Sequence, residues 1–167
     1  MQQIVVIGHN IRSSHNVGSL LRTAEGLGVD TVYLTGYTPY PLLRNDERLP
    51  HLAIKISNQI AKTALGAERY IQWRHSDSIN QVITDLRKQS FTIVGLEQAP
   101  HSIPLPEFTQ SGNIALILGS EVEGMNQELL TLCDIITEIP MFGKKESFNV
   151  VQAAAMALYQ FRFYRND

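Results

Sequence analysis

The stretch that decides the fold is QQIVVIG at residues 2–8, followed by HNIRSSHNVGSLLRTAEGLG at residues 9–28. The first part is a short apolar run rich in β-branched residues, which predicts a strand, and the second is a polar turn leading into a segment of helical periodicity. A strand that passes through such a turn into a helix is typical of a nucleotide site. However, the glycines here are wrongly spaced for G-x-G-x-x-G, and no P-loop pattern occurs in the chain. The turn therefore offers side chains rather than a glycine-rich phosphate cradle.

The composition narrows the class of protein. With 167 residues, of which 44% are hydrophobic, the chain fits a single domain over residues 1–167. No apolar run approaches the roughly 20 residues of a membrane span, and the first residues lack a signal-peptide pattern, so we expect a cytoplasmic protein. The net charge of −2 means that any nucleic-acid surface must be a local patch. The lone Cys133 excludes an intramolecular disulfide and predicts a buried, reduced thiol.

Short β-branched runs alternate with longer segments of 3.6-residue period. Near-continuous apolar strands separated by helices predict an α/β fold, with a parallel sheet covered by helices on both faces. The expected strands are QIVVIG (3–8), TVYLTG (31–36), RYIQW (69–73), FTIVGL (91–96), NIALILG (113–119) and DIITEIP (134–140). The stretch 36–50 carries three prolines and several charges and is predicted to be a surface loop.

The first predicted helix has one apolar stripe and one polar side. At about 100° per residue, the stripe comprises Val17, Leu20, Leu21, Ala24 and Leu27. Arg22 lies off the stripe, so it is not a core residue. Two interpretations stay open from this helix alone: a solvated arginine paired with Glu25 at i+3, or a functional group.

A second stretch, residues 113–141, combines an apolar strand with the loop Gly-Ser-Glu-Val-Glu-Gly at 119–124. The carboxyl end of a strand is the usual ligand edge of an open parallel sheet. Glu121 and Glu123 could suggest a metal, but no histidine or third carboxylate follows at ligand spacing, so we expect no metal. The alternative is a glycine turn with solvated acids.

A third stretch, EIPMFGKKESFNVVQAAAMALYQFRF at residues 138–163, runs from a strand through a loop into an alanine-rich helix. We expect Ser147 to open this helix, where it could serve simply as an N-cap. Asn149 has no such local role in this prediction. The expected apolar face of the helix is Val150, Val151, Ala154, Ala157, Leu158 and Phe161. Its alanines favour close packing, within the chain or against another subunit.

Taken together, these stretches resemble the SpoU (TrmH) family of RNA ribose 2′-O-methyltransferases, of the SPOUT class, along nearly the whole chain. The family's first motif, Asn-x-Gly-x-x-x-Arg, is matched by Asn16, Gly18 and Arg22. Its second motif is matched by Gly119, Glu121, Gly124, Cys133, Asp134, Ile139, Pro140 and Met141. Its third, Ser-x-Asn-Val, is matched by Ser147, Asn149 and Val150. Phe148 and Met125 depart from it, since leucine is commoner at both positions.

This resemblance implies a parallel α/β sheet whose C-terminal third forms a trefoil knot, an exception to the rule against knots, and it implies a homodimer. It also implies S-adenosylmethionine as cofactor, held largely by backbone groups in the knot. The cofactor-binding residues implied are Leu118, Gly119, Ile139, Met141 and Phe148. The residues implied at the reaction centre are Asn16, Arg22, Glu121, Ser147 and Asn149.

The expected reaction is methyl transfer to a ribose 2′-hydroxyl of tRNA or rRNA, with tRNA slightly favoured. Because a guanidinium stays protonated, we expect Arg22 to clamp a phosphate and stabilise the developing alkoxide rather than act as a base. Glu121 is expected to orient Arg22 or its own loop, and Ser147 and Asn149 to place the hydroxyl.

Arg12, Lys144 and Lys145 are candidates for RNA phosphate contacts, although exposed cations are solvated by default. Two rival functions remain open at this point. One is a non-catalytic RNA-binding protein of the same fold. The other is a nucleotide-dependent oxidoreductase, which the missing glycine pattern disfavours.

Overall fold

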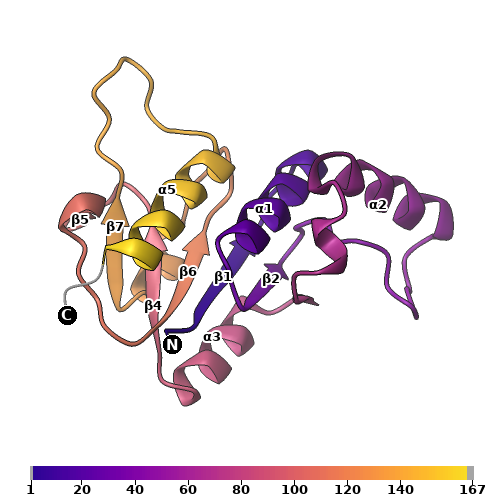
Figure 1. Cartoon of the computed structure of the whole chain (residues 1–167), viewed down its shortest axis with the longest axis horizontal. Helices are drawn as coiled ribbons and strands as arrows, with labels where there is room; N and C mark the ends of the chain where they lie inside the picture. The colour runs from indigo at the N-terminus through magenta and orange to yellow at the C-terminus, as the bar shows by residue number, and fades with distance from the viewer. Residues whose placement is uncertain (1, 165–167) are drawn as a thin grey trace.

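The computed structural model describes residues 2–164 and shows a seven-stranded sheet with the order β3-β2-β1-β6-β4-β7-β5 (Figure 1). All neighbouring strands run parallel. The strands are β1 (Ile4–His9), β2 (Thr31–Thr35), β3 (Trp73–Ser76), β4 (Phe91–Leu96), β5 (Ile103–Pro104), β6 (Asn113–Leu118) and β7 (Ile135–Glu138). The helices are α1 (Ser14–Gly26), α2 (Pro50–Ala64), α3 (Ile79–Lys88), α4 (Gln127–Thr131) and α5 (Val150–Phe163), with 3-10 turns η1 (Ala67–Arg69) and η2 (Leu105–Glu107).

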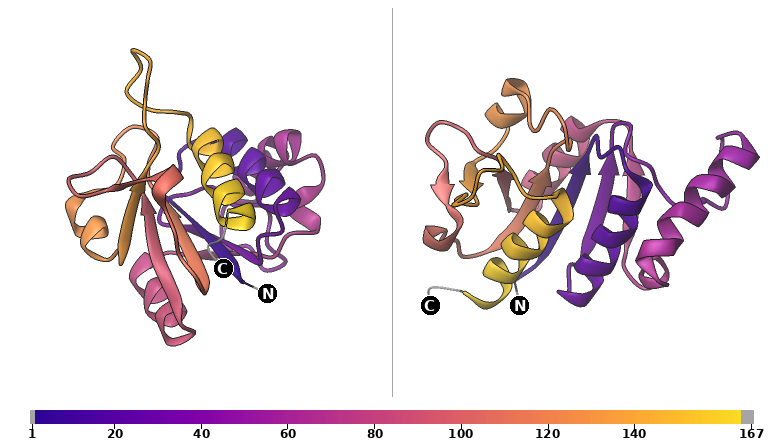
Figure 2. Two further views of the ribbon diagram at one scale, coloured as in Figure 1. Left: turned by 60° about the vertical axis from the view of Figure 1, so that its left-hand side comes forward. Right: turned by 90° about the horizontal axis from the view of Figure 1, so that it is seen from above.

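Helices cover both faces of the sheet, so the predicted α/β architecture is confirmed. One face buries the apolar sides of α1 and α5 against β1, β2 and β6, with α2 outside α1. The other face carries a second apolar cluster beneath α3 and α4. Figure 2 shows α3 on the side of the sheet opposite α1 and α5. The predicted stripe of α1 is buried except for Leu27, which is half-buried.

Helices α1 and α2 touch closely at one glycine. A Cβ atom built on Gly18 would lie 2.1 Å from the carbonyl oxygen of Ile60 and 2.2 Å from Oγ1 of Thr63. Any side chain at Gly18 therefore forces the two helices apart. The glycine of the first motif has a packing role here.

One predicted strand is wrong in position, and one short strand was missed. The run RYIQW does not form a strand, because α2 ends in left-handed geometry at Leu65 and Gly66 and the chain turns through η1. The run is apolar partly because Ile71 is buried in the core, and β3 begins only at Trp73. The two-residue strand β5 was not predicted, since so short an element leaves no periodic signal.

The start of the last helix also differs from the prediction. Helix α5 begins at Val150, and its N-cap is Asn149, whose side chain accepts a hydrogen bond of 2.9 Å from the backbone N of Val151. Ser147 is not the cap. Of the predicted apolar face, Ala154, Ala157, Leu158 and Phe161 are buried, and the first two valines are half-buried.

The predicted surface loop is confirmed, and the prediction of a buried thiol at Cys133 is confirmed in part. The stretch 36–50 is a mostly exposed loop, held partly by the guanidinium of Arg48, whose carbon lies 3.6 Å from the centre of the Tyr40 ring. Cys133 is a free, half-buried thiol, and burial raises its pKa to about 11. Such a thiol stays protonated at neutral pH and acts as a small apolar group.

Candidate active site

A cleft of about 750 Å³ opens at the carboxyl ends of β4, β6 and β7. This volume falls within the range of roughly 300–1,000 Å³ that is typical of small-molecule sites. Ten of the thirteen residues proposed from the sequence line it: Asn16, Leu118, Gly119, Glu121, Ile139, Met141, Lys145, Ser147, Phe148 and Asn149. Arg12, Arg22 and Lys144 do not. The structure thus brings the three sequence motifs to one place.

A chain of hydrogen bonds joins the three motifs. The side-chain amide of Asn149 donates to Oδ1 of Asn16 over 3.3 Å, and the amide of Asn16 donates to Oε1 of Glu121 over 2.9 Å. Glu121 also accepts from the backbone N atoms of Arg12 at 2.8 Å and Ser13 at 3.3 Å. Segments separated by more than a hundred residues in sequence are therefore held together by one carboxylate.

The environment of Glu121 favours its ionised form. Burial opposes ionisation, but the hydrogen bonds from Arg12, Asn16 and Ser13 hold the pKa of the carboxyl below its ordinary value. The charge also faces the amino end of α1, where the helix dipole favours an anion. Glu121 therefore fixes its own loop onto α1, and no hydrogen bond from Arg22 to Glu121 occurs in the described part of the chain.

The loop 119–124 is closed by two glycines. A Cβ on Gly119 would lie 2.7 Å from the backbone C and O atoms of Gly124, and Gly124 itself has a φ of +65°. The loop returns on itself through hydrogen bonds between Ser120 and Gly124. Glu97, at the end of β4, accepts a 2.8 Å bond from the backbone N of Met125 and so holds the loop from the other side.

Glu97 is a lining residue that our sequence analysis missed. Its signal was available, because it directly follows the predicted strand FTIVGL and therefore lies at the ligand edge of the sheet. No motif drew attention to it. Gln98 also lines the cleft, and its side-chain amide donates a 2.7 Å bond to the backbone oxygen of Glu146.

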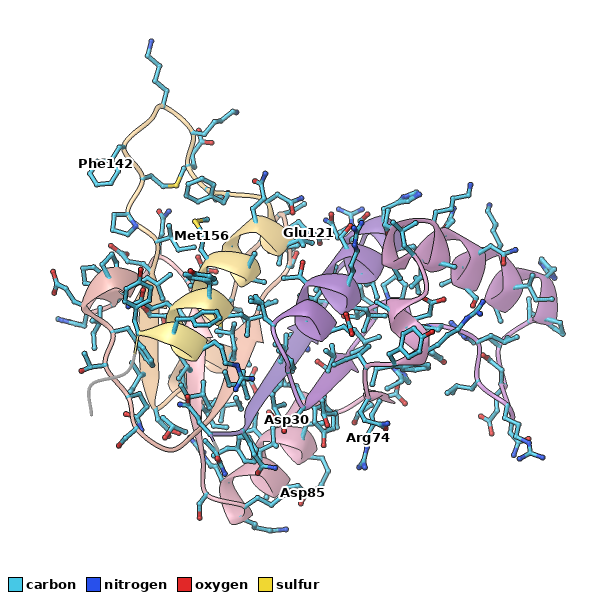
Figure 3. The ribbon with its side chains drawn as sticks, in the orientation of Figure 1. Asp30, Arg74, Asp85, Glu121, Phe142 and Met156 are labelled. Carbon is cyan, nitrogen blue, oxygen red and sulfur yellow. The ribbon has the colours of Figure 1, made fainter. Side chains whose placement is uncertain are left out.

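That bond anchors the segment 139–149, which rises above the rest of the molecule between β7 and α5 (Figure 1). Phe142 is 99% exposed near the tip of this segment, where Figure 3 labels it. Lys144 and Lys145 are also exposed, and Nζ of Lys145 lies 4.0 Å from a carboxylate oxygen of Glu146. The predicted phosphate-contacting lysines thus project into solvent.

Arg22 is exposed on α1 and lies about 9 Å further along the helix axis than Asn16. Arg22 is thus solvated, as one of the two interpretations expected, but among residues 2–164 no ion pair joins it to Glu25. The side chain of Arg12 is exposed too, and its backbone N donates to Glu121.

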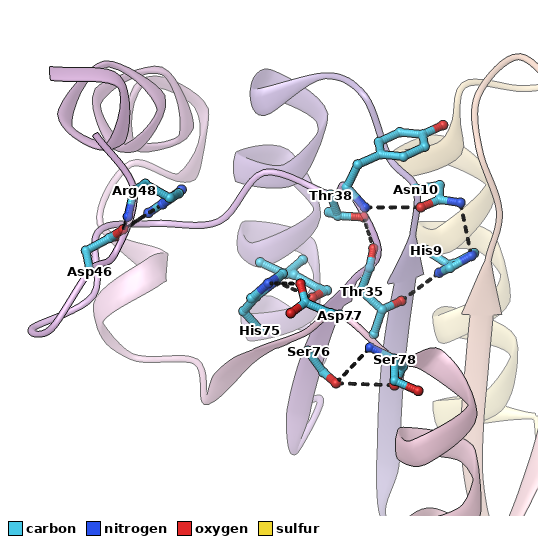
Figure 4. Close-up of polar contacts among 12 residues, drawn as sticks. His9, Asn10, Thr35, Thr38, Asp46, Arg48, His75, Ser76, Asp77 and Ser78 are labelled. Atoms are coloured by element: carbon cyan, nitrogen blue, oxygen red, sulfur yellow. Dashed lines mark hydrogen bonds and ion pairs between the residues drawn. The ribbon is translucent and has the colours of Figure 1, made fainter. Parts of the chain in front are cut away.

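The same sheet edge looks different beyond β1 and β2 (Figure 4). The amide of Asn10 donates to Nε2 of His9 over 3.0 Å, which leaves Nδ1 to donate to Oγ1 of Thr35 over 2.9 Å. The hydroxyl of Thr38 accepts from the backbone N of Ile11. Burial lowers the pKa of His9. The polar side chains at this half of the edge therefore form hydrogen bonds within the protein itself.

No helix within residues 2–164 is long and apolar enough to cross a membrane, and no group of three histidine, cysteine, aspartate or glutamate side chains in that range is placed to hold a metal ion.

Comparisons with known proteins agree with the geometry. The model of the SpoU rRNA Methylase family matches residues 3–159. A protein of Staphylococcus haemolyticus, provisionally named as a TrmH family tRNA/rRNA methyltransferase, is 28% identical over 156 residues; the match covers 93% of this chain and 57% of that relative. The chain thus spans little more than half the length of this relative.

Solved structures share the fold. The AdoMet-bound rRNA methyltransferase from Sinorhizobium meliloti superposes with a TM-score of 0.80 at 20% identity, covering 96% of this chain and 56% of that one. A chain from a structural study of the 2-OH methylation of C/U34 on tRNA gives a TM-score of 0.74 at 19% identity, covering 95% of this chain and 93% of that one.

Proposed function

Because the chain belongs to the SpoU rRNA methylase family, we propose that it transfers a methyl group from S-adenosylmethionine to a ribose 2′-hydroxyl of RNA. The observation that carries this proposal is the hydrogen-bonded chain from Asn149 through Asn16 to Glu121, at the mouth of a cleft of small-molecule size. Residues of all three sequence motifs line this cleft, which favours a functional site over a simple gap in packing.

The cleft fits this cofactor chemically. Leu96, Leu118 and Ile139 supply an apolar wall suited to an adenine ring, and five glutamates line the cleft against one lysine, which suits a cationic sulfonium. The absent side chain of Gly119 lets the loop backbone close against Gly124. Bound there, S-adenosylmethionine supplies an electrophilic methyl group whose leaving group is a neutral thioether.

The protein's own task is to position a weakly acidic hydroxyl and stabilise charge as it develops. Ser147 and Asn149 lie on the rim of the cleft, where their hydroxyl and amide can hold the ribose. The amide of Asn149 is already aligned by Asn16. Arg22 contributes as an electrostatic clamp on phosphate and alkoxide, because its guanidinium stays protonated.

Arg22 does not line the cleft of its own chain, so we place its action in a homodimer. Helices α1 and α5 lie side by side on one face of the sheet (Figure 1). Tyr159 and Phe163 of α5 are 52% and 61% exposed there, an apolar surface that a second copy could cover. In that dimer, Arg22 of one subunit serves the cleft of the other.

We favour tRNA over rRNA as substrate. The support is that the chain shares its fold with a chain studied for tRNA 2-OH methylation, at a TM-score of 0.74, and with a tRNA modifying enzyme of A. aeolicus, at a TM-score of 0.78. A trefoil knot in the C-terminal third, which the family resemblance implies, and a cytoplasmic location belong to the same proposal.

The test is incubation of purified protein with methyl-labelled S-adenosylmethionine and undermodified RNA, followed by digestion to nucleosides. We expect label on a 2′-O-methyl nucleoside of the tRNA fraction, and strongly reduced label with Arg22→Ala. Arg69→Ala, which removes an exposed arginine of η1, is the matched control.

Label on a base overturns the ribose assignment. Cofactor binding without methyl transfer to any RNA fraction overturns the proposed reaction. If the wild-type protein neither binds the cofactor nor transfers a methyl group, the result favours the alternative, a non-catalytic RNA-binding protein of this fold. Recovery of activity on mixing inactive Arg22→Ala and Asn149→Ala proteins supports action across a dimer, and no recovery contradicts it.

A further inference from the structure

The cleft cannot be what attracts RNA. Five carboxylates line it, those of Glu97, Glu121, Glu123, Glu138 and Glu146, and Lys145 is its single cation. Glu146 also lies 4.0 Å from Nζ of Lys145 and offsets its charge. Because RNA is a polyanion, and the whole chain has a net charge of −2, the cations that hold it must be concentrated elsewhere.

The segment that contains α2 carries no acidic side chain. From Arg48 to Ala67 the sequence is RLPHLAIKISNQIAKTALGA, with no aspartate or glutamate, and it contains the whole of α2. The flanking acids are Glu47, which is exposed before the helix, and Glu68, whose side chain is only 13% exposed.

Four of the polar side chains of α2 gather on one face. At about 100° per residue, His51, Lys55, Asn58 and Lys62 fall within an arc of about 60°. Directly opposite are Ala53, Ile60 and Ala64, which are buried. All four polar residues are exposed, so this outer face of α2 presents two lysines, an imidazole and an amide to solvent.

The C-terminal end of α2 lies beside the rim of the cleft, and the helix extends away from it. The hydroxyl of Thr63, at the end of α2, donates a 2.8 Å bond to the backbone oxygen of His15, and Asn16 follows on the rim of the cleft. Gly18 holds the two helices in direct contact. With 15 residues, α2 is about 22 Å long and extends outward from the sheet (Figure 1).

We propose that the outer face of α2, formed by His51, Lys55, Asn58 and Lys62, binds the phosphate backbone of the RNA whose ribose enters the cleft. This inference rests on the proposed function for the identity of the polyanion. Lys55 and Lys62 contact phosphates as point charges, and Asn58 between them donates a hydrogen bond. The contact is independent of base sequence, so it sets affinity and leaves the choice of nucleotide to the cleft.

The test measures RNA binding and methyl transfer separately. Binding of an unmodified tRNA transcript pool and of fragmented unmodified rRNA is followed by filter binding over a range of salt concentrations. Lys55→Gln/Lys62→Gln keeps helix propensity and removes two charges. We expect roughly tenfold weaker binding, a salt slope smaller by about one per lost phosphate contact, and an unchanged affinity for S-adenosylmethionine.

Two further variants keep the test independent of folding. Arg74→Gln removes an exposed cation from edge strand β3, which Figure 3 places well away from α2, and it should leave RNA affinity unchanged. Asn58→Lys adds a cation between the two lysines and should tighten RNA binding. A merely destabilised helix cannot produce tighter binding.

The outcomes separate the two ideas. If wild-type protein methylates RNA but the double variant binds like Arg74→Gln, the surface is overturned and the reaction stands. If wild-type protein transfers no methyl group yet its RNA binding depends on Lys55 and Lys62, the surface stands and the reaction is overturned. Absence of RNA binding by the wild-type protein overturns the surface.

Discussion

Both halves of the carboxyl edge of the sheet carry polar side chains, but the two halves use them differently. Beyond β1 and β2, His9, Asn10 and Thr35 bond to one another and fill the edge. Beyond β4, β6 and β7, Glu121 and Glu97 bond mainly to backbone N–H groups of the loops, and a cleft remains. An edge becomes a site where the polar side chains anchor loops through backbone N–H groups instead of bonding to one another.

The largest effect that would test this contrast is expected from Gly119→Ala in the open half. The new Cβ would lie 2.7 Å from the backbone of Gly124, so the loop must shift. We expect S-adenosylmethionine binding to weaken by about 3 kcal/mol, roughly a hundredfold, as measured by calorimetry. Gly143→Ala, which has no neighbour within 4 Å, is the control. Equal binding by both variants would show that this cleft does not hold the cofactor.

Gly36→Ala tests the closed half and should be the next largest effect. Gly36 has a φ of +63°, and a Cβ there would lie 2.0 Å from Oδ1 of Asn10. We expect the free energy of unfolding to fall by about 2 kcal/mol, with cofactor affinity unchanged, by denaturant titration. Gly112→Ala, with a positive φ but nothing nearby, isolates the backbone strain. A loss of cofactor affinity in Gly36→Ala would show that the half beyond β1 and β2 also takes part in cofactor binding.

Glu121→Gln should have a smaller effect, and one that depends on pH. The pKa of Glu121 is held low in the folded protein, so its contribution to stability is present above the unfolded-state pKa and lost as pH falls through the folded-state value. At neutral pH we expect a loss of about 1 kcal/mol from weakened hydrogen bonds. Denaturation curves for wild type and variant should converge in acid, whereas a constant gap would contradict the role given to the charge.

The smallest effect is expected from His9 in the closed half. Burial lowers its pKa in the folded protein, so the unfolded chain binds more protons as pH falls below the ordinary histidine value, and stability declines there. His9→Gln should flatten the dependence of unfolding free energy on pH between about 7.5 and 5.5. An unchanged slope would mean that another group governs this range.

Much of the fold could be predicted because buried parallel strands leave continuous apolar runs, and five of the six expected strands are confirmed. The strand predicted at RYIQW is wrong, because Ile71 is buried in the core after a left-handed turn. The local sequence pattern does not distinguish such a buried residue from one in a strand. Boundaries failed where side chains decide them, as when Asn149 rather than Ser147 caps α5.

The candidate site was predictable as a set of residues but not as a geometry. The three sequence motifs predicted that Asn16, Glu121 and Asn149 belong to one site. The local sequence did not show that Glu121 would bond to the start of α1 rather than to Arg22. The hydrogen bonds of the closed half could not be predicted either, because the bond between His9 and Thr35 depends on the register of β1 and β2.

The hydrogen-bonded chain through Asn16 has a consequence for the order of events during synthesis. Its two links span 105 and 133 positions in sequence. Such distant contacts form only after the intervening elements have folded, because the entropy of closing a loop must be spent before the contact is made. On a ribosome the sheet could begin to assemble early, but the rim stays incomplete until residue 149 has emerged. A stalled or truncated chain that lacks α5 can therefore be folded in part and still lack the complete rim of the cleft.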